Sequence, residues 1–164
     1  MEKQEKTNVM RLLDQKKIPY TPHFYTESGE VNGMEIATVL GQNPNQVFKT
    51  LVTVGKSKKN YVFMIPVCCE LDLKKAAKAA GEKSVEMIKS KELLPLTGYV
   101  HGGCSPIGMK KFFTTFIDQS VQNCEIIYFS GGKIGCQVKL LLITLKRRFL
   151  FKLPISRTKL TEKF

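Results

Sequence analysis

The chain has 164 residues, 24% of them charged and 43% apolar, a composition typical of one folded globular domain and not of a disordered segment. It contains no apolar run of about 18 residues and no apolar leader after Met1, so we expect no membrane-spanning helix, no signal peptide and a cytoplasmic protein. The net charge of +12 favours a polyanionic partner such as nucleic acid, but residues 139–164 carry +7 of it, so charge alone supports such a partner only weakly.

The first half of the sequence alternates helical and extended patterns. Thr7 is a candidate N-cap for a helix over residues 7–17, because Val9, Leu12 and Leu13 recur at helical spacing. The next expected elements are, in order, a strand at 21–25 interrupted by Pro22, a polar turn at 28–33, a helix at 34–40 stopped by Gly41, and antiparallel strands at 47–54 and 61–67 joined by a hairpin at 56–60.

The second half predicts two further helices and three further strands. The expected elements are a helix over 71–81 with Asp72 as a helix-start acid, a short helix at 90–94 halted by Pro95, and strands at 112–118, 125–129 and 133–140. We therefore expect the α+β class: a single compact domain with a mixed, curved, barrel-like β-sheet flanked by helices.

The five cysteines predict reduced thiols. Their number is odd, no two are spaced as Cys-x-x-Cys, and only His23 and His101 accompany them. Neither a disulfide framework nor a zinc site fits this spacing, so we expect no bound metal. A thiol redox protein is an interpretation that only the number of cysteines favours, and the missing Cys-x-x-Cys pair argues against it.

A glycine-rich loop is predicted at residues 102–108, with the sequence Gly-Gly-Cys-Ser-Pro-Ile-Gly. Its backbone can approach a ligand closely, and successive amides can form a cup for an anion or an oxyanion. Lys49 lies in the otherwise apolar run 47–52, where a lysine either reaches the surface or projects into a pocket. No pair of carboxylates and no Ser/His/Asp order stands out, so a hydrolytic enzyme of this sequence must take its nucleophile from the substrate or from water.

Three segments together resemble the YbaK/EbsC family, free-standing relatives of the editing domain inserted in bacterial prolyl-tRNA synthetases. These segments are Val47–Val52, Gly102–Gly108 and Tyr128–Lys133. The resemblance implies a deacylase that acts in trans to remove cysteine misattached to tRNA(Pro), with tRNA(Cys) as a second candidate carrier. It also implies prolyl-tRNA synthetase as a partner, no metal or organic cofactor, no membrane, and the fold of the family.

The resemblance also implies roles for individual residues. In the family the cysteine substrate's own thiol attacks its ester to form a thiolactone, and the protein supplies position and oxyanion stabilisation. The implied catalytic residues are Lys49 and Gly102, and the implied substrate-binding residues are Tyr25, Phe48, Thr50, Gly103, Ser105, Pro106 and Ser130. Cys104 is not expected to be the nucleophile, because many relatives carry an aliphatic residue at its position. Ser105 is expected to be a hydrogen-bonding loop residue, since Gly-x-Ser-x-Gly is absent.

The resemblance covers about residues 8–138 and then fails. We therefore expect an editing domain over residues 1–138, followed over residues 139–164 by an atypical basic tail that replaces the expected last strand end and helix. The tail is either a genuine basic appendage or the product of an altered reading frame. Two alternative functions stay open: a tRNA- or nucleic-acid-binding module without activity, and a deacylase that prefers another amino acid, such as alanine.

Overall fold

The computed structural model describes residues 5–25, 33–148 and 160–163. The polar turn predicted at residues 28–33 lies outside the described residues except for Gly33. Within the described ranges, no helix combines the length and the apolar character needed to cross a bilayer. The elements are, in chain order, α1 (Asn8–Gln15), β1 (Thr21–Phe24), α2 (Gly33–Val39), β2 (Phe48–Gly55), β3 (Asn60–Pro66), β4 (Cys69–Leu71), α3 (Leu73–Ala80), β5 (Val85–Met87), α4 (Ser90–Thr97), β6 (Thr114–Ile117), the 3-10 helix η1 (Gln119–Asn123), β7 (Ile126–Ser130), β8 (Cys136–Leu141), α5 (Leu142–Arg148) and β9 (Thr161–Lys163).

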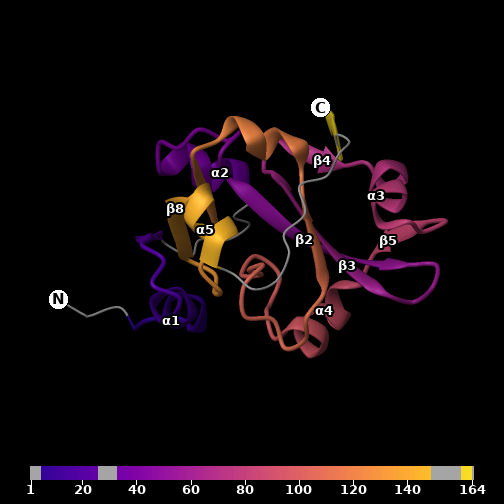
Figure 1. Cartoon of the computed structure of the whole chain (residues 1–164), viewed down its shortest axis with the longest axis horizontal. Coiled ribbons are helices and arrows are strands. Elements are labelled where there is room, and N and C mark those ends of the chain that lie inside the picture. Colours follow the sequence, from indigo (N-terminus) through magenta and orange to yellow (C-terminus); the bar gives the residue numbers. More distant parts are fainter. Residues whose placement is uncertain (1–4, 26–32, 149–159, 164) are drawn as a thin grey trace.

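The described strands form three hydrogen-bonded sheets, with the orders β5-β2-β3-β6, β1-β8-β7 and β4-β9. The predicted hairpin is confirmed, because β2 and β3 pair antiparallel from Phe48 opposite Pro66 to Val54 opposite Asn60. β3 pairs in parallel with β6, and a parallel bridge between Val47 and Tyr128 joins the two larger sheets. One mixed and two antiparallel sheets with helices around them confirm the α+β class (Figure 1).

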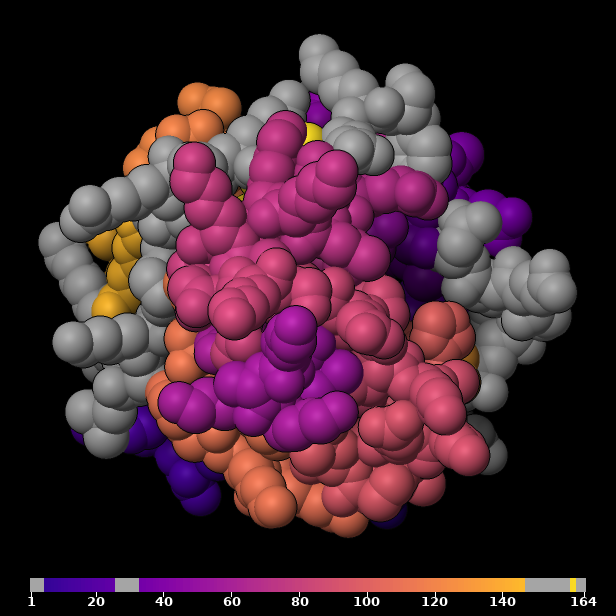
Figure 2. Space-filling view, turned by 90° about the vertical axis from the view of Figure 1, so that its right-hand side faces the viewer, coloured from indigo at the N-terminus to yellow at the C-terminus, as the bar shows by residue number. Residues whose placement is uncertain are grey.

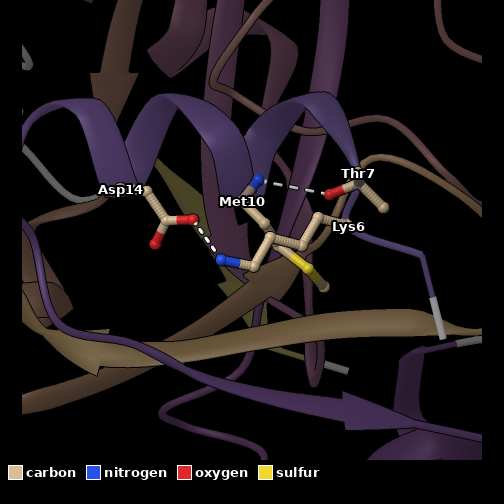
Figure 3. Close-up of polar contacts among 4 residues, drawn as sticks. All are labelled: Lys6, Thr7, Met10 and Asp14. Atoms are coloured by element: carbon tan, nitrogen blue, oxygen red, sulfur yellow. Dashed lines mark hydrogen bonds and ion pairs between the residues drawn. The ribbon is translucent and has the colours of Figure 1, made fainter. Parts of the chain in front are cut away.

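Helix α1 begins where the sequence predicts it. Thr7 has the extended backbone of an N-cap, and its Oγ1 accepts a hydrogen bond from the Met10 amide at 3.2 Å (Figure 3). On the outer side of the helix, Lys6 Nζ lies 2.7 Å from Asp14 Oδ2. Water screens this exposed ion pair, so it adds little to stability. The helix is held mainly by its inner face, where Leu13 is completely buried.

Helix α3 ends at Gly81 as predicted but begins at Leu73, two residues after the predicted start at 71. The Asp72 carboxylate accepts hydrogen bonds from the amides of Lys74 and Lys75 at 3.0 and 3.1 Å, which confirms Asp72 as a helix-start acid. Gly81 ends the helix in the left-handed conformation, with a φ of 72°.

The prediction that Pro95 ends α4 is wrong, since the helix continues to Thr97. A proline at this position removes only one backbone hydrogen bond, the one that its missing amide would donate to the Lys91 carbonyl. Burial of Leu93 and Thr97 offsets that loss, and the Thr97 hydroxyl donates to the Leu93 carbonyl at 2.7 Å. Tertiary packing therefore outweighs the local preference of proline.

Strand β3 is buried on both faces and divides the core into two clusters. Val62 and Met64 belong to the larger cluster, together with side chains of α1, β7 and β8. Phe63 and Ile65 belong to the smaller cluster, together with alanines of α3. Successive side chains of a strand point to opposite faces, so the continuous apolar run from 62 to 65 supplies both clusters.

The described part of the chain beyond residue 138 joins the same two clusters. β8 runs from Cys136 to Leu141, so the predicted division at residue 138 falls inside a strand, and α5 follows directly. Leu142 and Leu145 of α5 are buried in the larger cluster, and Leu160 is buried in the smaller one. Part of the predicted basic tail thus packs on the domain.

Leu160 is held through its backbone as well as its side chain. Its amide donates to Asp118 Oδ1 at 2.8 Å, and its carbonyl accepts from the Asp72 amide at 2.8 Å. Asp118 is completely buried, and its second oxygen accepts from the Ser120 amide at 3.1 Å. β9 then pairs antiparallel with β4. These contacts fix the segment after residue 159 to α3, β4 and β6.

We predict that Leu160→Ala lowers the free energy of unfolding by about 2–4 kcal/mol, because it opens a void in the smaller cluster. Urea denaturation followed by circular dichroism measures this change. Leu141→Ala is the matched control, because Leu141 is 47% exposed and its truncation leaves no buried cavity. Equal costs for the two variants would contradict the packing of Leu160 on the core.

Candidate active site

The cavity around Lys49 opens where β2 loses one of its neighbours. β5 pairs only with Thr53–Gly55 of β2, so in the described chain the first half of β2 is paired with β3 alone. A cavity of about 880 Å³ lies along this open stretch. Figure 2 shows a recess to the right of its centre, where dark purple atoms lie deep between magenta and pink ones. Lys49 and Thr50 point to opposite faces of the strand, and both reach the cavity because the sheet is open here.

The ammonium group of Lys49 is partly withdrawn from water. Burial lowers the pKa of Lys49 below its ordinary value of 10.5, while the negative charges of Glu70, Cys69 and Cys68 act in the opposite direction. A cation that has lost part of its hydration gains from an anionic or strongly polar ligand atom placed beside it. The cavity therefore favours a ligand that brings such an atom to Lys49.

The glycine loop presents its backbone to the same cavity. Gly102 lines the cavity with a φ of 85°, a conformation that glycine adopts without strain. Gly103 has a structural role, because a Cβ there would lie 3.0 Å from backbone atoms of Lys133 and Ile134. Its amide donates to the Val100 carbonyl at 3.0 Å. Among the loop amides, that of Gly103 is therefore already engaged.

Six of the nine predicted site residues line the cavity, and they come from separate segments of the chain. They are Tyr25, Phe48, Lys49, Thr50, Gly102 and Ser130. The Tyr25 amide donates to the Gly135 carbonyl at 3.0 Å, which holds Tyr25 beside the turn that follows β7. Ser130 Oγ accepts from the Gly132 amide at 3.2 Å. Thr50 Oγ1 is buried and has no hydrogen-bond partner among the described residues, so it can bind a ligand.

The other three predicted residues lie behind the cavity wall. Gly103, Ser105 and Pro106 are buried and do not line the cavity. Ser105 Oγ accepts a hydrogen bond from the Ile107 amide at 3.3 Å, a contact within the loop itself. Their part in substrate binding stays a prediction, while their packing gives the loop its shape.

Cys104 lines the cavity but has the properties of a poor nucleophile. Burial raises the pKa of its thiol to about 12, so the thiol stays protonated near neutral pH. Within the described part of the chain no hydrogen bond joins Cys104 to His101, although His101 also lines the cavity. Among the described residues, this thiol therefore has no hydrogen-bonded histidine that would activate it.

Glu70 and Gln137 are among the polar residues of the cavity that were not predicted. Gln137 is 4% exposed, and its Oε1 accepts a hydrogen bond from Gln42 Nε2 at 2.6 Å. Gln42 is 95 positions away in sequence, so no local pattern announces this contact. Glu70 lies in the three-residue strand β4, whose partner β9 is equally remote.

The cavity presents a cation, hydroxyl groups and backbone amides among apolar side chains. In the described ranges no three histidine, cysteine, aspartate or glutamate side chains are grouped so that they could hold a metal ion. A cavity of this kind suits a small acyl group attached to an anionic carrier, because the walls enclose the acyl group and the cation attracts the carrier. Fold and site together fit a domain that acts on an acyl group carried by an anionic polymer.

The comparisons with known proteins point to the same class. The sequence profile of the "Aminoacyl-tRNA editing domain" matches residues 12–147. An Enterococcus faecalis protein named "Putative Cys-tRNA(Pro)/Cys-tRNA(Cys) deacylase EbsC" is 46% identical over 138 residues, which are 84% of this chain and 84% of that protein.

Two crystal structures share the fold. One, described as "a putative trans-editing enzyme for prolyl tRNA synthetase", has a TM-score of 0.78 at 21% identity and covers 96% of this chain and 99% of its own. Another, of a hypothetical protein, has a TM-score of 0.81 at 19% identity and covers 94% of this chain and 99% of its own.

The chain belongs to the aminoacyl-tRNA editing domain family, the YbaK/EbsC group of the predicted resemblance. The extent of the match and the identity to the Enterococcus faecalis protein establish the membership, while the two crystal structures speak for the fold alone. The matched residues end at 147, beyond the predicted domain end at 138.

We predict that Glu70→Gln lowers the pKa of Lys49 further, because it removes the largest of the negative influences that oppose the effect of burial. Proton–carbon NMR of the lysine Cε groups, with Lys49 assigned from a Lys49→Arg spectrum, measures the titration. In the wild type the Lys49 midpoint should lie below 10.5. Glu92→Gln removes an equal charge from α4, outside the residues that line the cavity, and should leave the midpoint unchanged. A higher midpoint in Glu70→Gln would disprove the assignment of these influences.

Proposed function

We propose that this protein is a trans-editing deacylase that removes cysteine misattached to tRNA(Pro). The observation that carries the proposal is a single cavity lined both by the cation of Lys49 and by the backbone of Gly102. An aminoacyl ester at the end of a nucleic acid needs this combination: a positive charge for its anionic carrier and fixed donors for its carbonyl oxygen. The name of the Enterococcus faecalis relative supports the same substrate.

The substrate's own thiol is the nucleophile in this mechanism. The cavity-lining Cys104 is protonated near neutral pH, and the buried hydroxyl of Ser105 is engaged within its loop. The thiolate of the bound cysteine attacks the carbonyl carbon of its own ester and forms a carbon–sulfur bond. The bond from that carbon to the terminal ribose oxygen then breaks, the oxygen takes up a proton, and a thiolactone leaves. Because the attack is intramolecular, orientation by the cavity replaces a nucleophile from the protein.

The protein contributes to the tetrahedral step through position and charge. A fixed backbone donor such as the Gly102 amide stabilises a developing oxyanion by about 3 kcal/mol. Lys49 supplies positive charge beside the ester, and Thr50 Oγ1 offers a buried hydroxyl without a partner among the described residues. Selectivity follows partly from the reaction itself, because serine and alanine have no thiol to attack with.

The proposal extends to carriers and partners. Cysteine on tRNA(Cys) is a second substrate, since the reacting group is the same. Prolyl-tRNA synthetase is the partner that would supply misacylated tRNA(Pro), and the cytoplasm, where tRNA is aminoacylated, is the compartment. Free thiols at all five cysteines suit a reducing compartment of this kind.

We predict that Lys49→Ala lowers the single-turnover rate of cysteinyl-tRNA(Pro) deacylation at least tenfold, a loss of about 1.4 kcal/mol of transition-state stabilisation. Release of labelled cysteine measures the rate. Lys139→Ala is a control with the same change in charge at a partly exposed lysine that does not line the cavity. If a folded Lys49→Ala protein kept wild-type activity, Lys49 would have no catalytic role.

The thiol chemistry makes a separate prediction about enzyme and substrate. Cys104→Ser should retain most activity, because the attacking sulfur belongs to the substrate. Cysteinyl-tRNA should be cleaved much faster than seryl-, alanyl- or prolyl-tRNA, as a neutral hydroxyl is a weaker nucleophile and a side chain without a heteroatom is none. A covalent adduct on Cys104, detected by mass spectrometry, would overturn this mechanism. If alanine were released fastest, the enzyme would prefer alanine to cysteine. If the protein bound tRNA without releasing any amino acid, it would be a binding module.

A further inference from the structure

Basic side chains gather on the segment that begins α4 and on the loop that follows this helix. Residues 88–113 contain Lys89, Lys91, Lys110 and Lys111 but only one acidic residue, Glu92. The side chains of all five are exposed. We call the four lysines the α4 basic surface.

Contacts at the two ends of α4 relate this surface to the cavity. Lys89 precedes α4 and lines the cavity. Lys110 lies at the other end of the helix, where its amide donates to the Thr97 carbonyl at 3.0 Å and its aliphatic chain lies over Gly98. From Gly98 the chain continues to Gly102, which again lines the cavity. An eight-residue helix spans about 12 Å, so the α4 basic surface extends about that far from the cavity edge at Lys89.

The position of the ester bond decides which cations can meet the RNA. When the aminoacyl group is inside the cavity, the phosphates of the last nucleotides must lie at its mouth. The hairpin between β2 and β3 also carries exposed lysines, at 56, 58 and 59, but it lies at the far end of β2. Seven residues of extended strand separate Lys56 from Lys49, about 23 Å. Those lysines are therefore too distant for the terminal phosphates, whereas the α4 basic surface begins at the cavity itself with Lys89. Figure 1 shows α4 away from the tip of the β2–β3 hairpin.

We propose that the α4 basic surface binds the phosphates of the single-stranded 3′ end and the adjoining acceptor stem of the tRNA. This inference rests on the proposed function and adds the surface through which the carrier is held. Lysines contact phosphates without reading the base sequence, so the surface accepts one tRNA as readily as another. Selectivity for the amino acid then comes from the cavity, and affinity for the carrier comes from α4.

The test compares two variants that lose the same charge at different places. The first is Lys91→Ala/Lys110→Ala/Lys111→Ala, which leaves the cavity-lining Lys89 in place. The second is Lys56→Ala/Lys58→Ala/Lys59→Ala in the hairpin. The probe is an uncharged RNA hairpin of acceptor-stem length with a single-stranded CCA end and a fluorophore at its 5′ end. Fluorescence anisotropy measures its Kd between about 50 and 200 mM salt.

We expect the first variant to bind the probe at least about tenfold more weakly. The slope of log Kd against log salt concentration should also fall by about two, because three phosphate contacts are lost. The hairpin variant should change Kd less than about twofold, and arginine at positions 91, 110 and 111 should restore binding, because the charge is kept. Thermal melts confirm that the exposed substitutions leave the fold intact.

Equal losses of affinity in the two alanine variants would overturn the proposal. Wild-type RNA affinity in the first variant would also overturn it, and this result is expected if the surface binds an acidic protein instead. The outcome is independent of catalysis, because the probe carries no amino acid. A wild-type protein that fails to deacylate cysteinyl-tRNA refutes the proposed function but leaves this comparison decisive. An active enzyme with equal losses refutes only the α4 basic surface.

Discussion

The antiparallel pairing of β2 with β3 is the interaction on which the rest of the structure depends. β3 is buried on both faces and supplies both core clusters, and β2 carries Lys49 at its open end. The register is fixed because each face of β3 meets a different set of apolar partners. A shift of one residue would reverse the faces of the hairpin and remove Lys49 from its position beside Glu70. The core thus sets the position of the charge in the site.

How much of the fold follows from the sequence depends on how local each signal is. The caps at Thr7 and Asp72 were predictable, because an N-cap needs only a side chain and the next few amides. β4, β5 and β9 were not predicted, since each has three residues and is defined by a distant partner. Pro95 shows the opposite failure, a strong local signal overridden by burial on either side of it. Patterns therefore identified the long elements and missed those that exist only through tertiary contacts.

The residues of the site likewise differ in whether a local signal in the sequence predicts them. Lys49 and Gly102 stand out in the sequence because a cation in an apolar strand and a cluster of glycines each need an explanation. Glu70 and Gln137 do not, because their importance arises from what lies opposite them in space. The glycine loop contains residues of both kinds: Gly102 faces the cavity, whereas Ser105 maintains the loop from behind. A motif can therefore mark the place of a site without saying which of its members touch the ligand.

Because of the pairing of β4 with β9, the two sides of the cavity differ in local stability. This pairing joins segments on the order of ninety residues apart, so closing it costs more chain entropy than closing the β2–β3 hairpin. It is also only three residues long, whereas β2 and β3 pair along seven. Such a contact forms late in folding and opens first in the native state. The side of the cavity that carries Glu70 should therefore exchange its amide hydrogens faster than the side that carries Lys49.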